Sequence, residues 1–180
     1  MSYSTVVFVC GLLFTLSTQA QTLTVAGGKT IRAATKHDVV RLEGNFDWKP
    51  EVWSNDNWNL SLNHAVSLIY FTDVNDVWAA SWAPNFILTP ADRSGFYPYL
   101  QFGIGVALFS EEELESEDSE PTDDGTTNLG SHGQFESSLA LGLVRDRFSI
   151  RVKVYHFSNA NLAGRNDGID TAEVGISYRF

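Results

Sequence analysis

The end of the chain alternates apolar and polar residues with a period of two. One face of this segment carries Ala172, Val174, Ile176, Tyr178 and Phe180, and the residues between them are mostly polar. Successive side chains of a strand point to opposite faces, so the pattern predicts a β-strand with one apolar and one polar face. An apolar face that ends on a C-terminal aromatic residue is typical of the closing strand of an outer-membrane β-barrel.

The same alternation recurs along most of the chain. It predicts eight strands, around residues 23–34, 38–48, 58–70, 78–88, 98–108, 135–143, 148–154 and 170–180. An even number of strands joined by short hairpins favours an up-and-down antiparallel sheet. Many of the predicted strands approach the ~9–11 residues that cross a membrane.

The charges within the strands indicate which face looks outward. Arg41, Glu43, Arg151 and Lys153 lie mid-strand on the polar face, and Glu136 has the same inward parity. A water-soluble barrel of this size has an apolar interior, so here the apolar face must look toward lipid. Tryptophan and tyrosine residues cluster near the predicted strand ends, as in interfacial girdles. The sequence therefore predicts an all-β, eight-stranded antiparallel transmembrane β-barrel whose interior charges pair into a network. A soluble lipocalin-like barrel is the structural alternative.

The first twenty residues are typical of a secretory signal. An apolar run over residues 6–16 precedes Ala20, after which a peptidase would cut. We expect residues 1–20 to be a signal peptide and residues 21–180 to form one barrel domain. The only cysteine, Cys10, lies inside the apolar run after Val9, which disfavours lipidation. Because the chain is expected to be an exported barrel, we expect the protein to lie in the outer membrane of a Gram-negative bacterium.

Charge and loop length constrain partners and orientation. The formal net charge is −10, which argues against a nucleic-acid partner. Much of the acidic excess lies in residues 111–124, where we expect a solvated loop, with divalent-cation binding as the alternative. Long loops of such barrels face outside the cell. Residues 110–133 and 159–169 are therefore expected to be external, and residues 49–57, 89–95 and 145–147 to be periplasmic turns.

Three candidate catalytic residues share one face at the expected external end. His156 and Ser158 have the parity of the lipid-facing residues of their strand, and Asp170 has the same parity at the start of the next strand. A serine nucleophile needs an adjacent imidazole, and the imidazole needs an acid that fixes its tautomer. Polar groups directed at hydrocarbon are costly, so such a cluster favours a functional role. Glu173 lies nearby on the inward parity and is the weaker candidate for the acid.

Two segments resemble a known family. Residues 155–160 (YHFSNA), followed by residues 166–170 (NDGID), resemble the signature of the lipid A 3-O-deacylases, the PagL-type outer-membrane barrel enzymes. Residues 98–110 (PYLQFGIGVALFS) are similar to the fifth strand of that family. The similarity extends from about residue 37 onward.

The resemblance implies a catalytic assignment. It implies Ser158 as nucleophile, His156 as general base and Asp170 as the orienting acid, at a position where the family commonly has Glu. Asn159 and Asn166 occupy motif positions that could supply oxyanion donors, or could serve the turns of the loop. The implied activity is removal of the 3-O-linked acyl chain of lipid A from lipopolysaccharide, with no cofactor and no metal.

Other functions remain open at this point. One alternative is a non-enzymatic barrel for adhesion or membrane integrity, with the acidic loop as its contact surface. Another is a barrel hydrolase that acts on phospholipid or a different ester. The oligomeric state stays open, with a homodimer among the alternatives. His64 has outward parity on its strand and could contact the substrate or lie near the membrane interface. His37 and His132 fall in loops and have no ligand-like companions, so we do not expect a metal site.

Overall fold

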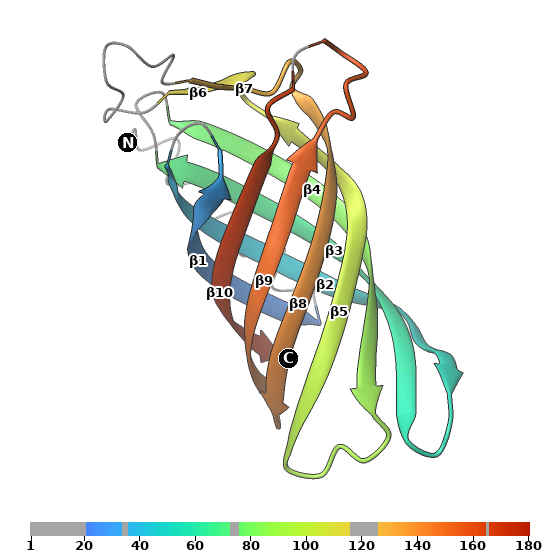
Figure 1. Cartoon of the computed structure of the whole chain (residues 1–180). Helices are drawn as coiled ribbons and strands as arrows, with labels where there is room; N and C mark the ends of the chain where they lie inside the picture. The colour runs from blue at the N-terminus through green and yellow to red at the C-terminus, as the bar shows by residue number, and fades with distance from the viewer. Residues whose placement is uncertain (1–20, 34–35, 73–75, 116–125, 165) are drawn as a thin grey trace.

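The computed structural model describes residues 21–33, 36–72, 76–115, 126–164 and 166–180. Eight long strands form a closed antiparallel barrel in the order β1-β10-β9-β8-β5-β4-β3-β2 (Figure 1). The barrel strands are β1 (Thr22–Arg32), β2 (Asp38–Ser54), β3 (Trp58–Thr72), β4 (Val77–Pro90), β5 (Phe96–Phe109), β8 (Gly133–Arg145), β9 (Phe148–Ser158) and β10 (Ile169–Arg179). The predicted fold class is confirmed. The expected signal peptide, residues 1–20, lies outside the described residues.

The connections divide the barrel into two ends. At one end, which we call the loop end, lie the β5–β8 connection and the loop of residues 159–168 between β9 and β10. At the other, the turn end, lie the β2–β3, β4–β5 and β8–β9 turns (Figure 1). The turns are shorter than the sequence indicated, because β2 continues to Ser54 and β4 to Pro90. β2 reaches that length through two register shifts against β3, between Asp47 and Lys49 and between Lys49 and Trp53.

The acidic segment contains secondary structure that its composition did not indicate. Short strands β6 (Glu113–Glu115) and β7 (Thr126–Asn128) pair to form a separate two-stranded sheet at the loop end. The expectation of a solvated loop is therefore wrong for residues 113–115 in that they form a strand, although Glu113 and Glu115 are exposed. Residues 116–124 lie outside the described residues. Leu114 of β6 is buried, as is Leu129 just after β7. These two apolar side chains fix the small sheet to the barrel despite its exposed carboxylates.

The barrel interior holds the predicted charge network. Arg41 donates to both carboxylate oxygens of Glu173, from Nε at 2.9 Å and from Nη2 at 3.1 Å. Arg151 binds Glu43 in the same two-pronged way, at 2.7 and 2.9 Å, and the Lys153 ammonium lies 3.6 Å from Glu43. The network also includes Glu136, whose Oε2 lies 3.8 Å from Arg41. Tyr155, whose ring stacks under the Arg41 guanidinium at 3.6 Å, also belongs to the network. Neither Tyr155 nor Glu173 was among its predicted members. Glu173 therefore serves the interior and does not point to the outer wall.

The interior changes character toward the loop end. There the inward side chains form an apolar cluster, which includes Val39, Ile69, Phe71, Val77, Phe109, Phe157 and Ile169 together with Leu114 and Leu129. The alternation predicted a polar inward face, and at this end the inward face is apolar instead. The reason is that the β6–β7 sheet covers the loop end, so inward residues there are buried against protein and not against water. The cluster gives the strand ends that carry His156, Ser158 and Asp170 a packed support.

We predict that Glu43→Ala destabilises the barrel by roughly 3–5 kcal/mol, because the substitution leaves the buried Arg151 and Lys153 without their shared carboxylate. Unfolding in urea of the protein refolded into liposomes, followed by tryptophan fluorescence, measures this difference. Glu51→Ala, which removes an exposed carboxylate from the same strand, serves as the control and should leave the stability nearly unchanged. Equal stability of the two variants would contradict the role of the network.

Candidate active site

The three predicted residues lie on the outer wall of the barrel at the loop end. In the antiparallel ladder, His156 of β9 lies directly opposite Asp170 of β10. Their side chains therefore project from the same side of the sheet. Ser158 follows two residues after His156, where the strand ends, and has the same parity. The register places all three groups on the lipid-facing side, as the alternation predicted.

His156 and Asp170 form a hydrogen bond. Nδ1 of His156 lies 2.5 Å from Oδ1 of Asp170. The imidazole is about half exposed and the carboxylate about a quarter exposed, at 48% and 24%. A carboxylate at Nδ1 holds the proton on that nitrogen and leaves Nε2 as the basic atom. Asp170 thus reaches the imidazole despite its side chain being shorter than that of Glu.

Oγ of Ser158 accepts two hydrogen bonds from the loop that follows it. Nδ2 of Asn166 donates at 2.8 Å, and the backbone N–H of Ala160 donates at 3.1 Å. In the described part of the chain, no hydrogen bond joins Oγ to the imidazole of His156. The two side chains are neighbours on one face, and catalytic hydrogen bonds often tighten only when substrate is bound.

The loop after Ser158 turns sharply. Ala160 and Asn161 both have positive φ, at 54° and 60°, a conformation that non-glycine residues seldom adopt. Gly168 has a φ of 66° at the other end of the loop, and a Cβ there would lie 3.3 Å from the carbonyl oxygen of Phe157 and 3.6 Å from Cε1 of His156. The left-handed backbone and the tight approach to the Phe157 carbonyl both favour glycine at this position. The strained turn brings Asn166 back toward Ser158.

Asn159 does not lie where the oxyanion expectation placed it. Its side chain is buried, and Nδ2 donates to the carbonyl of Leu129 at 2.8 Å while Oδ1 accepts from the N–H of Asn161 at 2.7 Å. The physical reason is strand parity, since the residue after the outward Ser158 points inward. The structure therefore brings Asn166, and not the Asn159 amide, to the serine.

A shallow apolar groove runs down the outer wall from His156 and Asp170. Its lining includes Ile31, Phe102, Leu139 and Val154, from β1, β5, β8 and β9. Ile31 is the bulged residue of β1, at the point where the register against β10 shifts. The outward parity of Phe102, Leu139 and Val154 was readable from the sequence, but their grouping beside His156 depends on the strand order and shear of the barrel.

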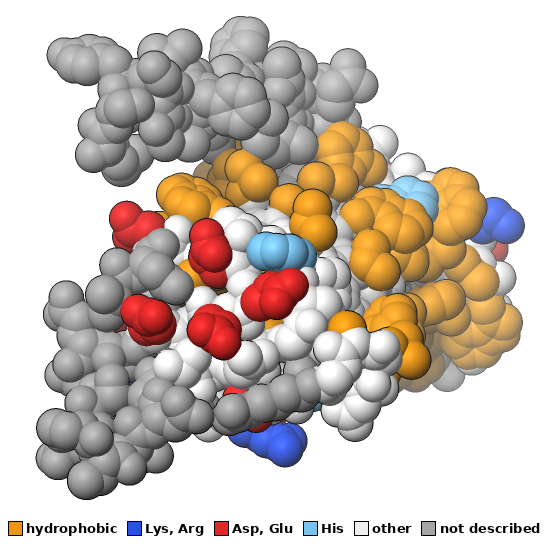
Figure 2. All heavy atoms as spheres, turned by 90° about the horizontal axis from the view of Figure 1, so that it is seen from above, with side chains coloured by type: hydrophobic (Ala, Val, Ile, Leu, Met, Phe, Trp, Pro, Cys, Tyr) orange, Lys and Arg blue, Asp and Glu red, His pale blue; other side chains and the backbone are white. Residues whose placement is uncertain are grey.

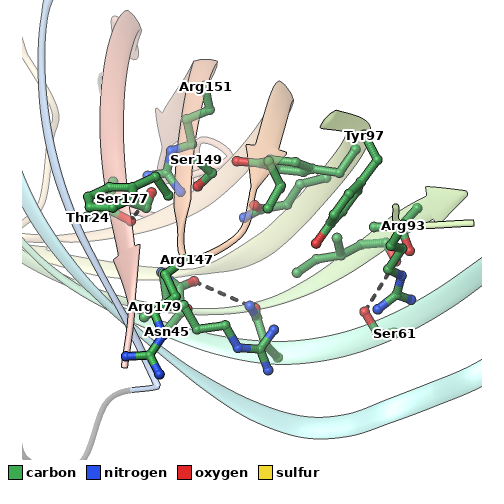
Figure 3. A pocket seen from close by; sticks show the side chains of 18 of the residues that line it. Thr24, Asn45, Ser61, Arg93, Tyr97, Arg147, Ser149, Arg151, Ser177 and Arg179 are labelled. Atoms are coloured by element: carbon green, nitrogen blue, oxygen red, sulfur yellow. Dashed lines mark hydrogen bonds between the residues drawn. The ribbon is translucent and has the colours of Figure 1, made fainter. Parts of the chain in front are cut away.

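A second hollow lies inside the barrel at the turn end. This cavity of about 170 Å³ is lined by polar residues, which include Thr24, Asn45, Ser61, Tyr97, Ser149 and Ser177 (Figure 3). The guanidinium groups of Arg93, Arg147 and Arg179 also line it (Figure 3). Thr24 and Ser177 are joined by a hydrogen bond of 2.8 Å. The hollow lies within the barrel, away from the outer wall that carries His156 and Ser158.

The chain matches the model of the family described as lipid A 3-O-deacylase (PagL) over residues 38–179. The chain belongs to this family. A curated relative, the lipid A deacylase PagL of Pseudomonas aeruginosa, is 30% identical over 159 residues, which cover 86% of this chain and 84% of the relative. The lipid A deacylase PagL of Bordetella bronchiseptica is 27% identical over 171 residues, with 89% and 88% covered.

A solved structure, that of the outer membrane enzyme PagL, is also similar to the chain. Its TM-score is 0.76 at 26% sequence identity, and the match covers 88% of this chain and 99% of that one. The expected family and barrel are therefore confirmed. Membership in a family of enzymes also decides against the alternative of a non-enzymatic barrel.

Proposed function

We propose that this chain removes the 3-O-linked acyl chain of lipid A by a Ser158–His156–Asp170 mechanism. The observation that carries the mechanism is the hydrogen bond between His156 and Asp170, on the same outward face as Ser158. The family supports the coarser statement by itself: the chain is a lipid A 3-O-deacylase, an ester hydrolase of the outer membrane of a Gram-negative bacterium.

In the acylation step, Oγ of Ser158 attacks the ester carbonyl while Nε2 of His156 accepts the hydroxyl proton. Asp170 at Nδ1 stabilises the imidazolium that forms. The tetrahedral intermediate then collapses, the bond to the 3-oxygen of the sugar breaks, and His156 returns the proton to that oxygen. Water attacks the acyl-serine in the same way, releases the fatty acid and restores Ser158.

The negative charge of each tetrahedral intermediate needs donors beside Oγ. Nδ2 of Asn166 and the N–H of Ala160 both lie within 3.1 Å of Oγ in the free enzyme. A carbonyl bonded to Oγ places its oxygen within about 3 Å of the same donors after a small shift. We assign the oxyanion role to Asn166 together with this backbone N–H.

The groove below His156 suits the acyl chain. Apolar side chains line it, and it begins beside the imidazole that would receive the serine proton. An acyl chain of lipid A lies among the hydrocarbon chains of its leaflet, so it can occupy a groove on the lipid-facing wall without entering water. The position of the site outside the barrel therefore matches the location of the scissile ester.

We expect Ser158→Ala and His156→Ala each to abolish the loss of one hydroxyacyl mass from lipid A. Mass spectrometry of lipid A after incubation of purified protein with lipopolysaccharide measures this loss. Covalent labelling by a fluorophosphonate should occur in the unmodified protein and disappear in Ser158→Ala. Full activity of Ser158→Ala would refute the mechanism. A panel of phospholipid esters in the same assay tests the alternative substrate.

Asp170→Asn should lower kcat by about 100-fold or more, because the amide cannot stabilise the imidazolium and can hold the wrong tautomer. Asp170→Glu should retain most of the activity, since the imidazole is on the surface and can adjust to a longer carboxylate. Steady-state kinetics in detergent, with folding checked by heat-dependent mobility in gels, separates the two. The prediction fails if both variants are equally active.

Val154→Trp should lower kcat/KM for long acyl chains more than for short ones, because the indole fills the groove beside His156. Val152→Trp is the matched control, since Val152 faces outward on the same strand but does not line the groove. Competition between substrates with long and short acyl chains measures the ratio of their kcat/KM values directly. An unchanged ratio in Val154→Trp would show that the acyl chain lies elsewhere.

A further inference from the structure

The residue after Ser158 and the residue after Asn166 are both hydrogen-bonded to one short segment, the last residue of β7 (Asn128) and its successor Leu129. Asn159, directly after Ser158, donates to the carbonyl of Leu129. Asp167, directly after Asn166, exchanges two hydrogen bonds with Asn128: its N–H donates to the Asn128 carbonyl, and its carboxylate accepts from the Asn128 N–H, both at 2.9 Å. Consecutive residues of one segment thus hold both ends of the loop.

From these contacts we infer that the β6–β7 sheet positions the reacting groups, with Asp167 as the positioning residue. The inference rests on the proposed function. Ser158 and Asn166 each directly precede a residue that is hydrogen-bonded to Asn128 or Leu129. The two attachments therefore set the 2.8 Å separation between Oγ of Ser158 and Nδ2 of Asn166. Small displacements of reacting groups are costly in rate, so the attachment should control kcat.

The sheet that provides the attachment is itself fixed to the barrel. Nδ2 of Asn128 donates to Oε1 of Glu113 at 2.7 Å, which ties β7 to β6 across the small sheet. The N–H of Leu129 donates to the carbonyl of Glu112 at 2.7 Å, and the Leu129 side chain is fully buried in the apolar cluster. Acidic side chains lie on the surface at this end of the barrel (Figure 2).

Three variants separate a hydrogen-bond role of Asp167 from a role of its charge. Asp167→Ala removes the acceptor and the charge, whereas Asp167→Asn removes the charge but keeps an oxygen that can accept from Asn128. Glu115→Ala removes one exposed carboxylate from β6 without touching the 159–168 loop. We expect kcat to fall about 10- to 100-fold in Asp167→Ala, with little change in KM, because the acyl groove is untouched. Asp167→Asn and Glu115→Ala should remain close to the unmodified enzyme.

The rate of fluorophosphonate labelling of Ser158 provides a second readout and should fall in Asp167→Ala by a similar factor. Heat-dependent gel mobility verifies that each variant is folded. Unchanged kcat in folded Asp167→Ala would overturn the inference, and so would equal losses in Asp167→Ala and Asp167→Asn. Failure of the proposed function has a different signature, because Ser158→Ala would then remain active whatever the Asp167 variants do.

Discussion

The barrel depends on one constraint: a backbone surrounded by hydrocarbon must satisfy its polar groups internally. Closure of the sheet, with β1 paired to β10, meets this requirement because the barrel has no edge. Closure also fixes the two environments that each strand meets. Side chains of one parity face lipid, and those of the other parity fill the interior. The paired register of His156 and Asp170 is a direct product of this arrangement, since both lie on the outward parity of neighbouring strands.

The interior shows how such a barrel accommodates charge. The two arginine–glutamate pairs are two-pronged, so each carboxylate neutralises a guanidinium at the distance of a hydrogen bond. Toward the loop end the interior is apolar and is covered by the β6–β7 sheet. The strand ends that carry the proposed active site are thus supported from inside by packing, and the polar groups of that site remain on the outside.

Alternation predicted the strands, the face of each strand that looks toward lipid, and the common face of His156, Ser158 and Asp170, because these follow from parity alone. It also predicted the interior network, apart from Glu173, which it left as a weak candidate acid, and Tyr155. Parity could not identify the apolar cluster, since Phe71 and Phe157 are inward residues whose burial depends on the cover formed by distant Leu114 and Leu129. The attachment of Asp167 to Asn128 was equally inaccessible, because a contact between two loops depends on the folded barrel and leaves no periodic signal.

The outward placement of the proposed site determines how substrate reaches it. A cleft that opens to water samples dissolved molecules in three dimensions, whereas a groove on the lipid-facing wall samples only neighbours that diffuse laterally within one leaflet. The relevant concentration is then a mole fraction in the membrane, so added detergent or inert lipid dilutes the substrate even when its total amount is constant. The turnover rate therefore depends on the composition of the membrane in which the barrel is embedded.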